Sequence, residues 1–440
     1  FKQKTAYEIS LGLVGSEMCI RDRLDSVKLG YLIVCDDKIS KLCYGKVVED
    51  ENFFERVIDC SEKYLAPGII DVGVKICEPG ERHKESFRTA SLAAASGGVT
   101  SIITRPDTIP AIDTPEKLEF VKNRADKVSS VNIYTMAALT RERLGLEMTE
   151  FSFLQDAGAV GFTDCDQVIS NNKIMSRCLA YAASLGLLVQ GHPQDSTLTA
   201  DAAATSGKFA SLKGLPAVNT IAEKIGIQRD LALIELTGVK YHFDQISTSV
   251  GLEPFRQAKL AGLDVTAGVS IHHLTLNEMD IGDYRTFFKI KPPLRSESDR
   301  LAMVAAVADG TIDVISSMHT PQDEESKRLP YEEAASGAVG LETILPAALQ
   351  LYHNGSITLP GLFRALSLNP AKRFNVPGGT LNIGSNADLV LFDPNSPFVL
   401  NRFALMSKSK NTPYDETVMQ GKIIKTFVSG REVYGASASE

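Results

Sequence analysis

Strand patterns alternate with helix patterns through the middle of the chain, and this alternation limits the fold more than any other feature. Helical patterns such as "ESFRTASLAAASGG" and "PEKLEFVKNRADKV" lie between most of the strand candidates, and several end in Gly, a frequent helix stop. Eight such strands predict a (β/α)₈ barrel, or TIM barrel; the alternative for a parallel sheet is a doubly wound fold, and the count of eight favours the barrel. The candidates are Ile69–Ile76, Thr100–Arg105, Asn132–Met136, Ala159–Asp164, Leu187–His192, Lys240–Ser247, Asp264–Ser270 and Ile312–Met318.

Short β segments lie on both sides of this middle region. "VKLGYLIVCDDKISKLCYGKV" precedes it, and "GGTLNIGSNADLVLFDP" and "VMQGKIIKTFVSGREVYG" follow it, each with turns at Gly, Asn or Asp. They predict one small β-sandwich domain built from both ends of the chain. We therefore expect β-domain segments at residues 24–65 and 371–435, with the barrel at residues 66–370.

The first residues need a separate interpretation. "FKQKTAYEISLGLVGSEMCIRDR" has no initiating Met, and its apolar part is too short and wrongly flanked for a signal peptide. It resembles the conceptual translation of a sequencing-adapter read. We expect residues 1–23 to be a non-native or artefactual segment and leave them out of the fold prediction; the alternative is a natural extension.

Composition excludes several classes of protein. The formal net charge of −8 argues against a nucleic-acid partner, because such sites need clustered Lys and Arg. No apolar run approaches the ~20 residues that cross a bilayer. The seven cysteines show no CxxC spacing, which favours reduced thiols. We expect a cytoplasmic protein without a membrane or nucleic-acid partner.

Polar positions at the end of the first barrel strand are where a barrel protein places its chemistry. The stretch "IIDVGVKICEPGERHKE" alternates Asp71, Gly73 and Lys75 with apolar residues and then enters the loop "EPGER". Asp71, Gly73 and Lys75 therefore share one side of the strand.

Motifs at several strand ends occur together in a characteristic order. They are "APGIIDV", "GGVTSIITRPDTIP", "AGAVGFTD", "KYHFDQIST", "HHLTLNE", "KPPLR", "GTIDVISS" and "SKSKNTPYDE". On these motifs, residues from about 30 to 435 resemble the bacterial class I dihydroorotases of the cyclic amidohydrolase superfamily, closest to an alphaproteobacterial branch with a degenerate first-strand motif. The resemblance implies a TIM barrel with a β domain. It also implies the reversible cyclisation of N-carbamoyl-aspartate to dihydroorotate in pyrimidine biosynthesis.

The resemblance also implies six metal-ligand positions. Divalent ions such as zinc, bound there, would polarise the amide carbonyl and activate water. Asp164, matching a bridging aspartate, and His192 remain; the position of the carboxylated lysine in other relatives is Thr163. A glycine has no ligating atom and an ammonium repels a cation, so we expect no cofactor, and zinc only if the chain is an active enzyme. The ligand positions that have been lost are Gly73, Lys75, Gln245 and Met318, the last being the family's general base.

The substrate positions that the resemblance implies are altered too. Cys77 replaces a carboxylate-binding arginine, Asp107 and Lys291 replace two asparagines, and Gln322 replaces a histidine. Asp107 would repel an anionic substrate unless paired, whereas Lys291 could bind one. These four residues are candidates for a remodelled pocket, and no residue is assigned as catalytic.

The other histidines do not supply the missing ligands. His242 points away from the barrel axis by strand alternation, and His319 faces away from the side of Met318. His272 and His273 belong to a structural loop in relatives. The two that remain, His83 and His353, lie in a charged loop and in a distant helix.

Each retained polar residue has two interpretations. Asp164 caps a helix or turn, or it is a vestigial ligand; His192 is a hydrogen-bonded remnant, or a ligand; Lys75 extends to the barrel surface, or it is buried. We predict that the Lys75 ammonium occupies the vacated metal space within about 4 Å of an Asp164 oxygen, the usual ion-pair limit.

Three functions are consistent with this pattern. The first is a catalytically impaired or inactive dihydroorotase homologue, a pseudoenzyme that acts as an assembly or regulatory partner of aspartate carbamoyltransferase or as a homo-oligomer. The second is an active cyclic amidohydrolase that uses one ion held by Asp164 and His192, or a metal-free route. The third is a ligand-binding sensor that uses Lys291 and Arg105.

Overall fold

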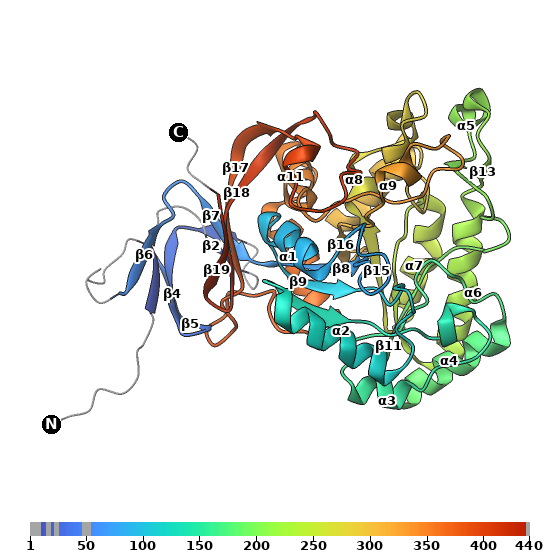
Figure 1. The fold of residues 1–440 in the computed structure, drawn as a ribbon, viewed down its shortest axis with the longest axis horizontal. Helices are drawn as coiled ribbons and strands as arrows, with labels where there is room; N and C mark the ends of the chain where they lie inside the picture. The colour runs from blue at the N-terminus through green and yellow to red at the C-terminus, as the bar shows by residue number, and fades with distance from the viewer. Residues whose placement is uncertain (1–9, 15–18, 22–25, 46–53, 437–440) are drawn as a thin grey trace.

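The computed structural model describes residues 10–14, 19–21, 26–45 and 54–436, which form a larger α/β body with a smaller β body beside it (Figure 1). Neighbouring barrel strands pair in parallel. The predicted TIM barrel is confirmed. Its strands are β8 (Ile69–Val74), β9 (Val99–Thr104), β10 (Asn132–Thr135), β11 (Leu188–Gly191), β14 (Lys240–Phe243), β15 (Val265–Ser270) and β16 (Val314–Ser316).

The fourth predicted strand, Ala159–Asp164, is shorter than its sequence pattern indicates. Only Phe162 forms β-bridges, one to Ala137 and one to Val189, both parallel. The ladder continues through it, because Phe162 N donates to Leu188 O at 3.0 Å and Gln190 N donates to Phe162 O at 2.8 Å. A turn begins at Asp164, whose carbonyl accepts from Gln167 N at 3.1 Å, and this turn ends the strand.

The first and last barrel strands meet through polar contacts. Lys75 N donates to His319 O at 2.9 Å, and Ser317 N donates to Asp71 Oδ1 at 2.8 Å. The Ser317 hydroxyl also donates to the second oxygen of Asp71. Asp71 is fully buried, and burial raises its pKa to about 6 against these hydrogen bonds. Asp71 therefore closes the barrel and is not part of the mouth.

Helices follow the barrel strands and cover their outer faces. The first, α1, starts at a capping box formed by Ser86 and Thr89 and ends at Gly97, as the sequence indicates. The main helices are α1 (Phe87–Ser96), α2 (Pro115–Val128), α3 (Phe151–Asp156), α4 (Asn172–Ser184), α6 (Ile221–Thr237), α7 (Ser249–Leu260), α9 (Glu297–Ala308) and α11 (Ile344–His353). Shorter elements are β12 (Ala204–Thr205), β13 (Ala217–Val218), α5 (Lys208–Lys213), α8 (Ile271–Thr275), α10 (Glu324–Lys327), α12 (Leu359–Phe363), α13 (Asn369–Phe374), η2 (Arg141–Arg143), η3 (Glu278–Ile281), η4 (Thr286–Phe288), the π-helix η5 (Arg364–Leu368) and η6 (Arg402–Ala404).

The smaller body is a β-sandwich in which strands from both ends of the chain pair. One sheet has the order β5-β4-β1-β6 and the other β19-β18-β17-β7-β2-β3. Successive side chains of β17 point to opposite faces of the sheet and pack into two hydrophobic cores. Leu389 and Leu391 lie in the core of the sandwich, and Val390 and Phe392 lie in the core of the barrel. The strands are β1 (Ser10–Val14), β2 (Cys19–Arg21), β3 (Ser26–Lys28), β4 (Gly30–Cys35), β5 (Lys38–Tyr44), β6 (Arg56–Asp59), β7 (Tyr64–Pro67), β17 (Leu389–Val399), β18 (Val418–Val428) and β19 (Arg431–Gly435).

Part of the segment set aside in the sequence analysis lies in this sandwich. Strand β1 pairs antiparallel with β4 and parallel with β6, and β2 pairs with β3 and β7. The non-native origin of residues 1–23 and the domain boundaries stay predictions. In the part of the chain that the structure describes, no helix has both the length and the apolar character to span a membrane.

Candidate functional site

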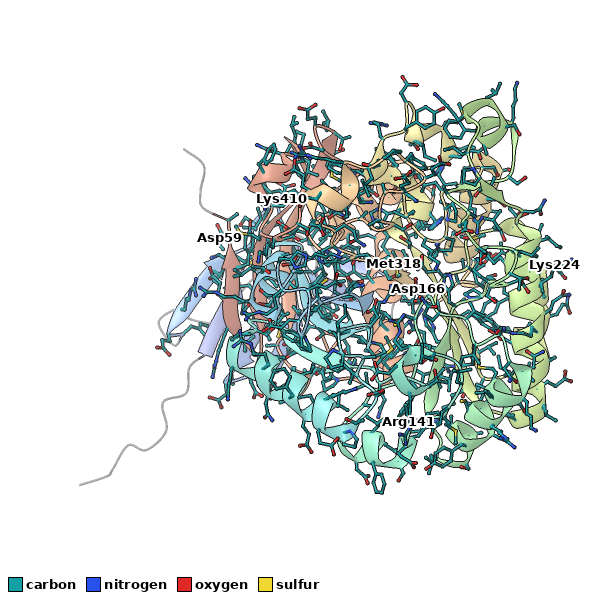
Figure 2. All side chains as sticks on the ribbon, turned by 45° about the vertical axis from the view of Figure 1, so that its right-hand side comes forward. Asp59, Arg141, Asp166, Lys224, Met318 and Lys410 are labelled. Atoms are coloured by element: carbon teal, nitrogen blue, oxygen red, sulfur yellow. The ribbon has the colours of Figure 1, made fainter. Side chains whose placement is uncertain are left out.

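The carboxyl ends of the barrel strands meet in one mouth. A Cβ atom built on Gly73, near the end of β8, would lie 3.3 Å from Met318 Sδ and 3.5 Å from Asp244 Oδ1. The first, sixth and eighth strands of the barrel therefore bring these positions together. Figure 2 places Met318 and Asp166 in the middle of the barrel body and Lys224 at its outer edge.

The backbone at two lost ligand positions has a special conformation. Gly73 has φ +79° at an irregularity in the pairing of β8 with β9, and Met318 has φ +47°. Left-handed backbone costs a residue with a side chain on the order of 1–2 kcal/mol, which glycine avoids. The local backbone thus suits glycine at position 73.

Lys75 is largely buried and pairs with Asp107. Its Nζ lies 3.3 Å from Asp107 Oδ2, and its side chain is 18% exposed. Burial opposes the charged ammonium, but Asp107 outweighs this and raises the pKa of Lys75. The predicted pair of Lys75 with Asp164 is wrong. Asp107 follows β9, the strand directly beside β8, and is therefore nearer than the fourth strand.

Asp107 is shared with a second cation, Arg105. The Arg105 guanidinium donates through Nη2 to Asp107 Oδ2 at 2.9 Å. Burial alone would raise the pKa of Asp107, but Arg105 and Lys75 hold it below its usual value. The carboxylate that would repel an anionic substrate is therefore neutralised within the protein.

Asp164 is held by neutral donors. Its Oδ1 accepts from Leu139 N at 2.9 Å and from Thr140 N at 3.0 Å, and the Thr140 hydroxyl donates to Oδ2. Within the described residues it has no ion-pair partner within 4 Å, and burial raises its pKa to about 6 against these bonds. The structural interpretation of Asp164 therefore fits. The turn that its carboxylate holds lies after β10, earlier in the chain than Asp164 itself.

Asp166, which the sequence analysis missed, is the centre of the charge network. Its carboxylate lies 3.4 Å from Arg105 Nη2, 3.2 Å from Arg143 Nη2 and 3.1 Å from Lys291 Nζ. Burial opposes its charge, but Arg105 and Lys291 lower its pKa well below the usual range. The available signal was the spacing in "TDCD", which puts a second carboxyl two residues after Asp164; nothing in the sequence indicated Arg143.

His192 is buried beside this network without a partner. It is 5% exposed, and neither ring nitrogen has a hydrogen-bond partner among the described residues. Burial, together with Lys291, lowers its pKa to about 3, so the ring is neutral. The hydrogen-bonded interpretation of His192 does not fit the structure.

Another buried carboxyl, Asp244, lies next to the lost ligand positions. Gln190 Nε2 donates to its Oδ1 at 2.9 Å, and the Gln245 side chain also hydrogen-bonds to it. Burial raises the pKa of Asp244 to about 6, opposed first by Arg105. Gln245, at a lost ligand position, thus hydrogen-bonds to the carboxyl group of its neighbour Asp244. Sequence reasoning missed Asp244 because the motif comparison weighted the next residue.

The remaining pocket candidates differ in their positions. Cys77 is buried, and burial raises the pKa of its thiol to about 12, with Lys75 and Asp107 among the nearby charges. Gln322 donates through Nε2 to Ser336 O at 2.8 Å, a contact outside the ion-pair network. The structure therefore joins Lys75, Asp107 and Lys291 through ion pairs.

The other buried histidines have partners of their own. The hydrogen-bond partners are Thr266 Oγ1 for His242, Tyr414 Oη for His272, Pro293 O for His273 and Gly340 N for His319.

The residues of the mouth do not fit a divalent metal. Both oxygens of Asp164 already accept hydrogen bonds, and the Lys75 ammonium occupies a ligand position. No group of three or more His, Cys, Asp or Glu in residues 10–14, 19–21, 26–45 and 54–436 could hold a metal ion. Catalytic zinc takes about three protein ligands. The described residues of the mouth therefore do not supply the ligand set that catalytic zinc usually takes.

Comparisons with known proteins agree with this fold. Residues 62–250 match the family "Dihydro-orotase-like". The "Dihydroorotase" of Ehrlichia canis (strain Jake) is 40% identical over 412 residues, which is 93% of this chain and 91% of the relative. That of Wolbachia sp. subsp. Drosophila simulans (strain wRi) is 38% identical over 406 residues, 92% of this chain and 91% of the relative.

Solved structures show the same architecture. The "L-Hydantoinase (Dihydropyrimidinase) from Arthrobacter aurescens" has a TM-score of 0.87 at 25% identity and covers 97% of this chain and 96% of its own. The dihydropyrimidinase from Brevibacillus agri NCHU1002, at 18% identity and a TM-score of 0.83, covers 97% of this chain and 95% of its own and supports the fold alone. With relatives of this identity matched over nine-tenths of its length, the chain belongs to the dihydroorotase family.

Proposed function

We propose that this chain is a dihydroorotase homologue of pyrimidine biosynthesis that lacks metal-dependent hydrolysis and serves as an assembly or regulatory partner of aspartate carbamoyltransferase. The observation that carries the first half is the ion pair between Lys75 and Asp107. The ammonium group of Lys75 lies at a position where the family has a metal ligand.

Hydrolysis of a cyclic amide needs an activated water and a group to stabilise the developing negative charge on oxygen. The general-base position holds Met318, which cannot take a proton. His192 is neutral and could accept one, but no described side chain hydrogen-bonds to it and orients its ring. These observations support a protein that keeps the fold of the family without its reaction.

The partner half of the proposal rests on the family resemblance. Some class I relatives with degenerate sites associate with aspartate carbamoyltransferase, the preceding enzyme of the pathway. A barrel that keeps its core and its β-sandwich while losing ligands is a stable body for such a role. The alternative assembly is a homo-oligomer.

One observation favours a second candidate, an active enzyme that holds a single ion. The two unpartnered nitrogens of His192 leave one imidazole available as a ligand. Asp164 would have to give up its bonds to Leu139 and Thr140 to join it. The backbone N–H groups of Leu139 and Thr140 would then stay buried without an acceptor. Each unsatisfied donor costs about 1–3 kcal/mol.

Metal analysis separates the two candidates. Protein purified with zinc in the medium and dialysed against a weak chelator should hold well under one equivalent of metal and give no dihydroorotate turnover with or without added zinc. His192→Ala is the matched control, because it should leave the metal content unchanged. Stoichiometric zinc that is lost in His192→Ala, together with turnover, would establish the enzyme instead.

Co-elution of the two proteins tests the proposed partnership. The full chain, mixed with aspartate carbamoyltransferase from the same source, should elute with it as one complex whose mass is measured by light scattering. The chain alone gives the mass of any homo-oligomer. Separate elution at concentrations of tens of micromolar, far above a typical micromolar Kd, would exclude the partnership.

A further inference from the structure

We infer that this chain forms a symmetric dimer in which the outer face of helix α6 packs antiparallel against the same face of a second copy. The inference goes beyond the proposed function, because it concerns the outer surface of the barrel and not its mouth. Helix α6 lies on the side of the barrel that faces away from the β-sandwich (Figure 1).

The outer face of α6 is largely apolar although it is exposed. Four exposed residues follow one another at spacings of four, three and four and so share one side of the helix: Ile221, Ile225, Gln228 and Ala232. Ile221 is 43% exposed and Ile225 is 40% exposed. Leu236, at the C-terminal end of the same side, is 73% exposed. A surface helix normally carries polar residues on its outer face, so this pattern predicts a packing partner.

The inner face of α6 is already used within the chain. Its buried residues, among them Ile227 and Ile234, belong to the core of the barrel. The helix also packs against α4 and α7, its neighbours around the barrel. A helix that is apolar on both faces is normally buried. The outer face of α6 is therefore the one that the described residues leave without a packing partner.

Two charged residues indicate that the partner is a second copy in an antiparallel arrangement. Lys224 and Glu235 are eleven residues apart, close to three helical turns, and so lie along the same edge of the outer face. Figure 2 shows Lys224 at the outer edge of the barrel. Neither residue has an ion-pair partner within the part of the chain that the structure describes. A two-fold axis that runs across this face at right angles to α6, midway between the two residues, brings Lys224 of each copy beside Glu235 of the other.

The same axis also matches the apolar residues. In this register Ile225 of one copy lies between Ala232 and Leu236 of the other, and the small Ala232 lets the two helices approach closely. In a parallel arrangement the two edges of the face would exchange, and Lys224 would lie opposite the edge that carries Leu236. The antiparallel arrangement is therefore the one that satisfies both the charged and the apolar residues.

Sedimentation velocity of the full chain measures the association. Helix α6 is about 25 Å long at 1.5 Å per residue, so it gives a small interface whose polar rim comes from α4 and α7. We expect the mass to rise from one chain to two with a Kd of about 1–100 micromolar. The mass of a single chain throughout this range would overturn the inference.

A charge in the middle of the apolar face tests its location. Ile225→Glu should raise the Kd at least about a hundredfold, because two carboxylates would be buried against apolar side chains. Phe120→Glu, at another exposed apolar residue, on α2, is the matched control and should leave the Kd unchanged. A dimer that Ile225→Glu does not weaken would have its interface elsewhere, which would refute the inference.

A charge exchange tests the antiparallel register. Lys224→Glu and Glu235→Lys should each weaken the dimer about tenfold, because each places like charges side by side at both ends of the interface. The double variant restores opposite charges and should recover the wild-type Kd. Additive losses in the double variant would refute the register. Both positions are on the surface, so this comparison decides the question even if Ile225→Glu fails to fold.

The other possible occupant of this face is aspartate carbamoyltransferase. A chain that stays monomeric, and whose complex with that enzyme is lost in Ile225→Glu but kept in Phe120→Glu, would assign the face to the enzyme and overturn the inference. Metal content and turnover, which do not involve the outer face of α6, test the loss of hydrolysis separately.

Discussion

Two carboxylates, Asp164 and Asp166, are separated by one residue and have opposite environments. Asp164 accepts hydrogen bonds from the turn after β10, and burial raises its pKa to about 6. Asp166 is surrounded by Arg105, Arg143 and Lys291, and its pKa is lowered well below the usual range. Cys165 between them has φ +56°, a left-handed turn that sends the two side chains to different surroundings. Burial alone does not decide the charge of a carboxyl; the donors around it do.

The two carboxylates of the "TDCD" motif also have different roles. The hydrogen bonds of Asp164 hold the loop that carries Arg143, whose Nε donates to Asp164 O at 3.2 Å. Asp166 then uses that arginine as an ion-pair partner. The first carboxylate is structural and the second is part of the charged mouth.

Removal of the Asp164 carboxylate should have the largest effect on stability. Asp164→Ala leaves the donors of Leu139 and Thr140 buried without an acceptor, and we expect a loss of about 2–3 kcal/mol in the free energy of unfolding. Asp164→Asn, which keeps an acceptor oxygen, should lose about half as much by the same reasoning. Urea unfolding measures both, and an unchanged midpoint for Asp164→Ala would show that the turn does not need this residue.

The pH dependence of stability should distinguish the two carboxylates. Because the folded-state pKa of Asp164 is raised from 3.8 to about 6, the folded state binds a proton more readily than the unfolded state. The contribution of Asp164 is therefore greatest below pH about 4 and is lost as the pH rises through about 6, on the order of 2 kcal/mol.

Asp166 has the opposite sign. Its folded-state pKa is lowered, so its contribution is present above its unfolded value of 3.8 and is lost as the pH falls further. The difference in stability between wild type and Asp164→Asn should change between pH 4 and 6, while that between wild type and Asp166→Asn should be flat there. A change between pH 4 and 6 for the second pair would contradict the assignment.

A double-mutant cycle tests which carboxylate Lys75 pairs with. Lys75→Met combined with Asp107→Asn should give a coupling energy of about 1 kcal/mol, because the pair is mostly buried but Arg105 still neutralises Asp107. Lys75→Met combined with Asp164→Asn should give a coupling near zero. Equal couplings would mean that Lys75 also stabilises Asp164.

The smallest effect should come from Asp166→Asn. Its side chain is about a third exposed, so solvent screens its ion pairs, and we expect a loss of less than about 1 kcal/mol. Raising the salt concentration should reduce that loss further. A loss as large as that of Asp164→Ala would show that Asp166 is structural.

The architecture could be predicted from the sequence. The period of the apolar residues predicted the barrel, helix α2 lies at Pro115–Val128 as its pattern indicated, and the motifs identified the family. The sequence also showed what is missing, because Gly73 has no side-chain ligand atom and the thioether of Met318 is not among the ligands that catalytic zinc takes. These features depend on residue type and on contacts along the chain, which a sequence displays directly.

Which charged groups form ion pairs could not be predicted, because it depends on how the strands and loops pack. Lys75 faces the mouth as predicted from strand alternation, yet it pairs with Asp107 because β9 lies beside β8. Asp166 gathers cations from three separate segments, and the left-handed turn at Cys165 directs it there. Ion-pair energies depend on separations of a few ångströms between groups far apart in sequence, and those separations are set by how strands and loops pack.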